Sequence, residues 1–390
     1  MVKKGFKQTE IGLIPEDWEV LSIEELCVSG GIVRGPFGGS LKKSFFVPSG
    51  YKVYEQKNAI YSNVNIGNYY ISFEKFNELR RFEVKEGDFI ISCSGTIGRI
   101  FQIPQKFEKG IINQALLKLT INRAKYSDIF FLHYFKWNNF QKIIIDNTQG
   151  GAMQNLIGMS DFKKTIIPFP PTKPEQEAIA KVLSDTDTLI EKLEQLIAKK
   201  RNIKTATMQQ LLKPKEGWEV KKLGDYLDYE QPTKYIVVDT KYDNHNQTPV
   251  LTAGKSFILG YTNEEFGIYR TLPVIIFDDF TTASKYVDFE FKVKSSAMKI
   301  LKPKPQANLR FIYELMQTIK FDSTDHKRYW ISEYQYIEVK VPKSDEQTRI
   351  AQILSDMDNE IEALEKKLNK YKMLKQGLMQ VLLTGKIRLV

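Results

Sequence analysis

Cysteine is scarce in this sequence, and long apolar runs are absent. Cys27 and Cys93 are the only two cysteines among 390 residues and lie far apart, which argues against a disulfide framework and for a reducing compartment, the cytoplasm. No apolar run approaches the roughly 18 residues that a membrane-spanning helix needs, so we expect no membrane partner. The first eight residues carry lysines but no apolar core after them, which predicts that no secretory signal is present.

Motifs for cofactors and metals are equally scarce. The three histidines do not cluster at the spacing of metal ligands. The glycine-rich run 30–39 lacks the G-x-G-x-x-G spacing and the acidic residue expected about 20 positions later. Gly254-Lys255-Ser256 resembles the end of a phosphate-binding loop, but Pro249 stands where the first glycine is needed. No Asn-Pro-Pro-aromatic motif of an amino-methyltransferase is present. We therefore expect no cofactor and no metal on this chain.

What the sequence does contain is an internal repeat. Glu175-Gln176 recurs as Glu346-Gln347, and Leu183-Ser184-Asp185 recurs as Leu354-Ser355-Asp356, both at an offset of 171 residues. The same offset relates the two segments for almost forty residues. A register that is kept over such a length indicates a duplication.

Both copies of the repeat predict long helices that pack on each other as an antiparallel coiled coil. Apolar residues follow the alternating three- and four-residue spacing of a coiled-coil seam. Lys204 and Lys375 are equivalent positions that interrupt both seams, and we expect the packing to loosen there because each ammonium reaches for water. About 38 residues make a helix of roughly 57 Å, and neither helix can bury such a stripe alone. The predicted seam residues are Leu183, Ile190, Leu193 and Ile197 in the first helix, and Leu354, Met357, Ile361, Leu364, Leu368 and Tyr371 in the second.

Each helix follows a lobe of mixed α/β character. Trp18-Glu19-Val20 recurs as Trp218-Glu219-Val220, and each triplet opens a lobe. A proline-flanked segment ends each lobe, as suits the start of a helix. We therefore predict two α/β (α+β) lobes in pseudo-repeat, joined by two long helices. The predicted order is a first lobe at 1–172, a first helical spacer at 173–213, a second lobe at 214–343 and a second helical spacer at 344–390.

Local patterns predict several elements within the lobes. Apolar and β-branched content is typical of strands, and longer apolar patterns of helices. The predicted strands are 89–92, 113–121 and 273–277, and the predicted helices are 127–145 and 309–318. The two tryptophans that open the lobes are expected to be core anchors where lobe and helix join, rather than stacking platforms for a ligand.

The positive charge is concentrated on the lobes. The net charge is +10, of which the two helical segments carry only +2, so a polyanion contacted at two places is favoured. Arg, Asn and Gln can pair with base edges, and Lys, Ser and Thr can hold phosphates. Loops with such residues follow a strand at matching places in the two lobes, although a solvated loop is an equally simple interpretation of any single residue. The candidate DNA contacts are Arg34, Lys42, Lys43, Ser94, Thr96, Arg99, Asn113 and Gln114 in the first lobe, and Thr281, Thr282, Lys285, Tyr286, Lys327, Arg328 and Tyr329 in the second.

One group of residues imitates a catalytic site. Asp278 and Asp279, followed by Glu290 and Lys292, resemble the acidic pair and the Glu-x-Lys of metal-dependent nucleases. A stand-alone metal-dependent DNA endonuclease is therefore the alternative function, and metal-dependent cleavage by the purified chain would reveal it. A third possibility is an assembly scaffold that does not read DNA.

The whole pattern resembles the specificity subunit of type I restriction–modification systems. The motifs that carry the resemblance are the opening 12–20, the turn 35–41, the tetrad 95–98, the two Glu-Gln helix openings and the ending 382–385. The resemblance implies a non-catalytic subunit with two target-recognition domains, each of which reads half of a bipartite site in double-stranded DNA.

The same resemblance implies partners. The paired helices would act as a spacer and as the seat for two modification subunits, which carry S-adenosylmethionine and methylate adenine. Restriction (motor-nuclease) subunits would use ATP and Mg²⁺. The second lobe lacks the Gly-Pro-Phe-Gly and Gly-Thr-Ile-Gly turns of the first lobe, so its contact residues are not implied by those turns.

Overall fold

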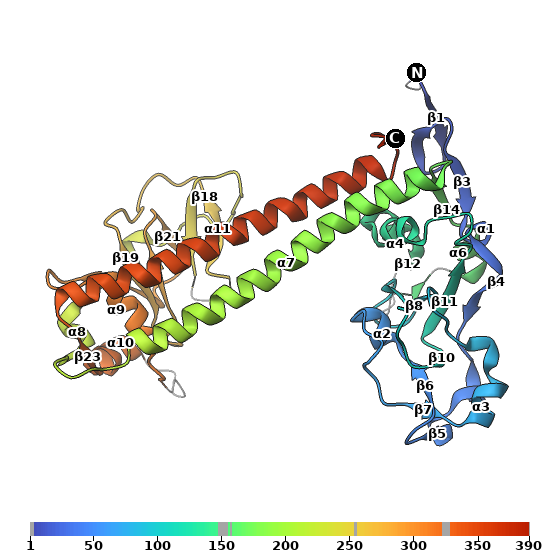
Figure 1. The fold of residues 1–390 in the computed structure, drawn as a ribbon. Helices are drawn as coiled ribbons and strands as arrows, with labels where there is room; N and C mark the ends of the chain where they lie inside the picture. Colours follow the sequence, from blue (N-terminus) through green and yellow to red (C-terminus); the bar gives the residue numbers. More distant parts are fainter. Residues whose placement is uncertain (1–3, 147–154, 157, 253–255, 322–327, 390) are drawn as a thin grey trace. The chain divides into compact units, whose positions relative to one another are not determined.

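The computed structural model describes residues 4–146, 155–156, 158–252, 256–321 and 328–389. The chain divides into two compact units, one formed by Met1–Lys192 with Leu368–Val390 and the other by Leu193–Lys367. The boundary falls within both long helices, so each unit holds one lobe together with part of each helix. The predicted α/β class, with two lobes and two long helices, is confirmed (Figure 1). No helix in the described ranges is long and apolar enough to cross a membrane.

The first lobe is built on two four-stranded sheets. The first sheet has the order β4-β11-β8-β9 with antiparallel neighbours, and the second has the order β10-β6-β7-β5 with a parallel β10–β6 pair. Ile90 and Leu116 from the first sheet and Tyr54 and Ile112 from the second share one apolar cluster, so the sheets pack on each other. The strands are β4 (Cys27–Arg34), β5 (Phe46–Val47), β6 (Tyr51–Tyr54), β7 (Tyr70–Ile71), β8 (Phe89–Ser92), β9 (Ile100–Gln102), β10 (Gly110–Ile112) and β11 (Leu116–Ile121).

A helical layer joins this lobe to the first long helix. Trp18 is fully buried, and its ring meets the edge of Phe130 at a centroid distance of 6.3 Å, which confirms its prediction as a core anchor. The helix predicted at 127–145 is interrupted, because Trp137 adopts an extended backbone and caps a second helix. The remaining elements are β1 (Phe6–Thr9), β2 (Gly12–Pro15), β3 (Glu19–Ser22), α1 (Ile23–Leu26), α2 (Gln56–Ile60), α3 (Phe73–Glu78), α4 (Asp128–Lys136), α5 (Asn138–Ile144), β12 (Ile145–Asp146), β13 (Asn155–Leu156), α6 (Met159–Lys164) and β14 (Ile166–Phe169).

The second lobe repeats this plan with fewer residues. Its main sheet has the order β16-β22-β19-β20, its smaller sheet β18-β17-β21, and β15 pairs with β23 as β3 pairs with β14. Trp218 lies edge-on to Phe311 at 6.4 Å, which repeats the contact of Trp18 with Phe130. The elements are β15 (Glu219–Lys222), α8 (Leu223–Tyr226), β16 (Leu227–Glu230), β17 (Thr248–Leu251), β18 (Ile258–Thr262), β19 (Val274–Asp278), β20 (Ser284–Val287), β21 (Lys292–Val293), β22 (Met298–Pro303), α9 (Leu309–Met316), α10 (Tyr329–Ser332) and β23 (Glu338–Val341).

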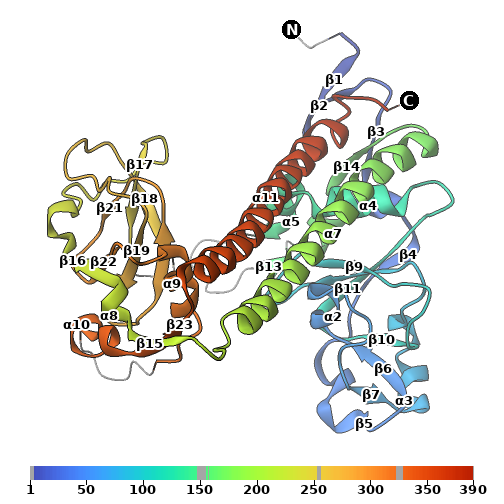
Figure 2. The ribbon, with the colours of Figure 1, turned by 60° about the vertical axis from the view of Figure 1, so that its left-hand side comes forward.

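The long helices are α7 (Lys173–Leu211) and α11 (Ser344–Leu382), each of 39 residues. Within each unit their segments lie side by side and run in opposite directions (Figures 1 and 2). Every predicted seam residue is buried or half-buried, as packing between the two helices requires.

The expectation that the two lysines of the seam turn to water is wrong. Lys204 pairs with Asp358 of the opposite helix at 2.7 Å, and Lys375 pairs with Asp187. An opposing carboxylate therefore holds each ammonium between the helices, where we expected water to attract it.

Candidate nucleic-acid interface

Three polar segments of the first lobe meet at one edge of its main sheet. Strand β4 ends at Arg34, β8 ends at Ser92 and β11 begins at Leu116, all at this edge. The N–H of Gly35 donates to the carbonyl of Leu116 at 2.9 Å, and the N–H of Cys93 donates to the carbonyl of Ala115 at the same distance. The segments that follow β4 and β8 are thus both held to the segment that precedes β11.

Gly35 permits the closest of these approaches. A Cβ atom at this position would lie 1.8 Å from the carbonyl oxygen of Asn113, so no other residue fits without moving the backbone. The side chain of Asn113 accepts a hydrogen bond from the N–H of Ala115 at 3.0 Å. This bond holds the turn that presents Gln114, whose side chain is exposed.

The loop after β8 is closed by a buried serine. The hydroxyl of Ser92 donates to the carbonyl of Thr96 at 2.6 Å and accepts from the N–H of Arg99 at 3.0 Å. Two glycines in this loop, Gly95 and Gly98, have positive φ angles of 64° and 72°, a region that glycine enters without strain. The closed loop leaves the side chains of Ser94, Thr96 and Arg99 exposed.

The second lobe closes the equivalent loop with an aspartate. Asp278 faces Met298 across the sheet as Ser92 faces Leu116, and its carboxylate accepts from the N–H of Phe280 at 2.9 Å and the hydroxyl of Thr281 at 2.7 Å. The prediction that the two loops occupy matching places is therefore confirmed.

Asp279 brings a further segment to the same edge. Its carbonyl accepts from the N–H of Tyr329 at 3.0 Å, and its carboxylate accepts from the N–H of Trp330 at 2.9 Å. The other carboxylate oxygen lies 3.1 Å from the ammonium of Lys299, and both side chains are buried. The start of α10 is thus fixed beside the loop, which places the exposed Arg328 there as well.

Most of the predicted DNA contacts lie at these edges or near them on the surface. The nine exposed residues are Lys42, Lys43, Ser94, Thr96, Arg99, Gln114, Thr281, Lys285 and Arg328; Arg34, Asn113, Thr282 and Tyr286 are half-buried; and Lys327 lies outside the described residues.

Two tyrosines of the second lobe that were predicted to contact DNA pack against other side chains of the protein. Tyr329 is only 2% exposed, and its ring lies edge-on to that of Phe321 at a centroid distance of 5.1 Å. It therefore belongs to the core, and the prediction that it contacts DNA is wrong. The ring of Tyr286 lies 5.0 Å from the guanidinium of Arg310 and 5.8 Å from the ring of Tyr313. Sequence alone could not separate these tyrosines from exposed ones, because both follow polar loops.

The residues that imitate a nuclease site are engaged elsewhere. Asp278 and Asp279 hold the loop and α10, and Lys292, which is fully buried, pairs with Glu264 at 2.6 Å and donates to a backbone carbonyl. Glu290 lies on the surface, 3.5 Å from Arg270. Among the described residues, no group of three or more His, Cys, Asp and Glu side chains could hold a metal ion. The hypothesis that these four residues form a nuclease site is therefore wrong.

Neither cysteine has the character of a nucleophile. Burial raises the pKa of the Cys93 thiol to about 11, although the neighbouring Arg34 guanidinium opposes this shift. Burial also raises the pKa of Cys27 to about 12. Both thiols stay protonated at neutral pH, so they behave as buried apolar groups.

The repeated Glu-Gln motif anchors each lobe to its helix. The amide of Gln176 donates to the carbonyl of Pro170 and accepts from the N–H of Ser127, which caps α4. Gln347 donates in the same way to the carbonyl of Pro342 at 2.9 Å. The sequence showed that the motif recurs, and the structure shows why: a buried amide ties the helix start to the proline segment before it.

The comparisons with known proteins agree with this arrangement. The family described as "Type I restriction modification DNA specificity domain" matches residues 15–200 and 215–372 of the chain. A putative type I restriction enzyme MjaX specificity subunit of Methanocaldococcus jannaschii is 25% identical over 423 aligned residues, which cover 99% of this chain and 97% of that protein. The specificity subunit of the type I restriction enzyme EcoR124I/EcoR124II of Escherichia coli is 47% identical over 158 residues, only 38% of this chain and 39% of its own length.

A solved structure supports the fold alone. The S subunit of a type I restriction–modification system from M. genitalium superposes with a TM-score of 0.63 and 18% identity, covering 98% of this chain and 97% of the other.

Proposed function

This chain belongs to the type I restriction–modification specificity subunits, and from that premise we propose that each of its two lobes reads one half of a bipartite site in double-stranded DNA. The observation that carries the proposal is the repeated sheet edge. Both lobes close the same loop with a buried side chain, Ser92 or Asp278, and leave polar and basic side chains exposed around it. Two edges on one chain can contact two stretches of one duplex.

The two edges carry different chemistry. The first presents Ser94, Arg99 and Gln114, whereas the second presents Lys285 and Arg328. Because base edges are distinguished by their donors and acceptors, two different edges suit two different half-site sequences. A dimer of identical readers would instead favour a symmetric site.

The helix pair is proposed as the spacer between the half-sites. Each helix of 39 residues has a length of about 58 Å, and the repeat supplies each unit with one copy of the motifs. These two equivalent copies are the proposed binding sites for two modification subunits. S-adenosylmethionine and adenine methylation are assigned to those subunits, and ATP and Mg²⁺ to the restriction subunits, so this chain itself is non-catalytic. Because the complex acts on DNA, the cytoplasm remains the expected compartment.

The direct test is to map methylated adenines in DNA from cells that carry this chain with its modification subunits. We expect methylation at one two-part sequence with a fixed gap. The matched variants Thr96→Ala and Thr281→Ala change equivalent loops, so the first should relax only one half of the sequence and the second only the other half. Methylation at one continuous site, or relaxation of the same half by both variants, would contradict the proposal.

A further inference from the structure

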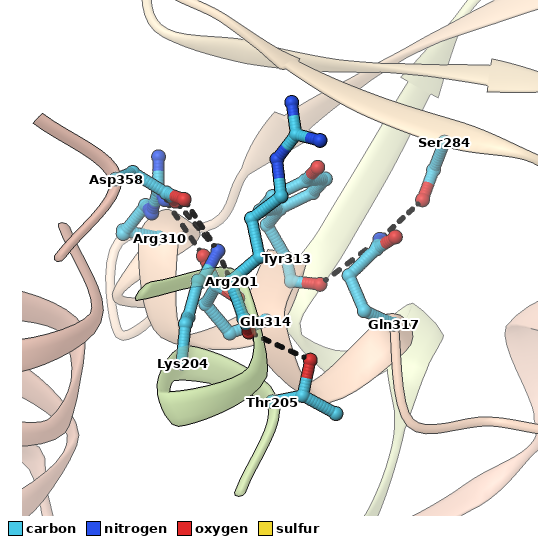
Figure 3. A network of polar contacts seen from close by, with 9 residues as sticks. All are labelled: Arg201, Lys204, Thr205, Ser284, Arg310, Tyr313, Glu314, Gln317 and Asp358. Carbon is cyan, nitrogen blue, oxygen red and sulfur yellow. Dashed lines mark hydrogen bonds and ion pairs between the residues drawn. The ribbon is translucent and has the colours of Figure 1, made fainter. Parts of the chain in front are cut away.

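Helix α9 lies between the long helices and strand β20 (Figure 3). Strand β20 follows the loop 279–283, which Asp278 closes and which we call the second reading loop. On the side of the long helices, Arg310 of α9 pairs with Asp358 of α11. Lys204 of α7 pairs with the same aspartate at 2.7 Å and lies 3.5 Å from Glu314 of α9. Two cationic side chains and two carboxylates thus join α9 to both long helices within the second unit.

On its other side, α9 holds strand β20. The amide of Gln317 donates to the hydroxyl of Ser284 at 2.9 Å, as Figure 3 shows. The guanidinium of Arg310 lies 5.0 Å from the ring of Tyr286 in β20 and 5.5 Å from the ring of Tyr313 in α9. Because β20 begins directly after the loop of Thr281, these contacts set where that loop lies relative to the long helices.

Arg310 takes part in both sets of contacts. A guanidinium is planar and carries several donors, so it can stack on rings while it pairs with carboxylates. Its side chain is only 19% exposed, and it pairs with Glu314 at 2.7 Å as well as with Asp358. A lysine at this position would supply the charge without the plane.

The first lobe makes the equivalent link with a histidine and without an arginine. Ile129 stands two residues after the cap of α4, as Arg310 stands two residues after the cap of α9. His133 of α4 lies with its Nε2 2.9 Å from the hydroxyl of Ser184 and with its Nδ1 3.9 Å from the carboxylate of Asp187 in α7, which pairs with Lys375 of α11. A guanidinium on the helix of the lobe, paired with the carboxylate between the long helices and stacked on two rings, therefore distinguishes α9 from α4.

We propose that Arg310 is a positioning residue that fixes how the second reading edge is presented by the helix pair, and hence the number of base pairs between the two half-sites. This inference rests on the proposed function. Arg310 does not read the half-site itself, because its guanidinium is taken up by carboxylates and rings. Its loss changes the angle of the edge while the loop closed by Asp278 remains intact.

The chain should fold without Arg310. Lys204 still compensates both Asp358 and Glu314 when the guanidinium is removed, so no buried acid is left without a cation. A second variant, Tyr286→Leu, removes the stacking partner and leaves all four charges in place. It provides the same test if Arg310→Gln fails to fold.

The experiment measures binding by the full chain, with its modification subunits, to duplexes in which the half-sites are fixed and the gap varies by single base pairs. The unchanged protein should prefer one gap, and Arg310→Gln, Arg310→Lys and Tyr286→Leu should reduce that preference by about tenfold. Arg201→Gln is the matched control, because Arg201 pairs with Glu365 between the same two helices.

Four outcomes of this experiment test the proposed role of Arg310. A broadened gap with both half-site sequences unchanged supports the proposal. A gap preference equal to that of the unchanged protein overturns it, as does a change in the second half-site sequence, which would make Arg310 or Tyr286 a reading residue. If the unchanged protein shows no two-part site at all, the proposed function is contradicted, and with it the role of Arg310 that rests on it.

Discussion

Lys204 and Asp358 meet across the two long helices with 2.7 Å between ammonium and carboxylate, and their counterparts in the repeat, Lys375 and Asp187, meet in the same way. The offset of 171 residues converts one pair into the other. Each pair therefore joins a lysine of one copy to an aspartate of the other copy. Only one antiparallel register allows both pairs to form, so these four residues specify that register.

The first prediction concerns the strength of this pairing. Asp358→Asn removes the carboxylate shared by Lys204 and Arg310 and should lower the free energy of unfolding by about 1–2 kcal/mol, between the values typical of exposed and of buried pairs. Asp356→Asn is the matched control, since its side chain is exposed on the same helix, and should change stability by less than about 0.5 kcal/mol. Urea unfolding measures both. Equal losses in the two variants would contradict a specific role for Asp358.

The second prediction concerns phosphate contacts. Arg99→Ala and Lys285→Ala each remove an exposed cation from a reading edge. If each cation neutralises one phosphate, the slope of log K against log salt should become shallower by about one. If a residue reads a guanine, the loss should instead fall on one base position and cost about 1–3 kcal/mol. Unaltered affinity, slope and sequence preference in both variants would remove these residues from the interface.

The third prediction concerns acid stability. Burial lowers the pKa of His133 to about 4, with Asp187 opposing the shift, whereas the unfolded chain titrates near 6.5. Only the unfolded state therefore takes up a proton as pH falls from about 6.5 to 4, so the stability linked to His133 is present above this window and lost within it.

His133→Gln removes this titration and should lose less stability than the unchanged protein between pH 7 and pH 4.5, by up to about 3 kcal/mol. His245→Gln is the control, because that side chain is 95% exposed. Urea unfolding at a series of pH values gives the comparison. Parallel pH profiles for the unchanged protein and His133→Gln would show that His133 does not stay neutral in the folded state.

The fourth prediction concerns cofactors. Titration calorimetry of the purified chain should detect neither S-adenosylmethionine nor ATP, since both are assigned to partner subunits. The same titrations of the chain with its modification subunits should detect S-adenosylmethionine, which controls for the activity of the ligand. Stoichiometric binding of either ligand to the isolated chain would overturn the non-catalytic assignment.

The architecture followed from the sequence because duplication is a long-range signal. The offset of 171 residues and the repeated tryptophan triplets predicted the order of lobes and helices, and the spacing of apolar residues predicted the seam. The matching loops were also predictable, because each follows a strand whose residues before the last are all apolar.

What the sequence could not predict depends on which side chains meet. Asp278 and Asp279 imitate a metal site in sequence, and only the folded chain shows one closing a loop and the other pairing with Lys299. In the same way, Lys204 interrupts the apolar pattern, and its partners lie far along the chain. The break at Trp137 was missed because both sides of it are apolar enough to continue a helix.

The gap between half-sites in a protein with lengthened helices tests directly whether the helix pair is the spacer. Seven residues added to α7 between Asp187 and Lys204, and seven added to α11 between Asp358 and Lys375, leave both crossed pairs and both seams in register. Each helix grows by about 10.5 Å, which corresponds to about three base pairs at roughly 3.4 Å per pair. Mapping of methylated adenines should then show both half-site sequences unchanged and the gap increased by about three base pairs, whereas either insertion alone should disrupt the pairing of the helices. A double-insertion protein that folds, directs methylation and keeps the original gap would show that the helices do not set the spacing.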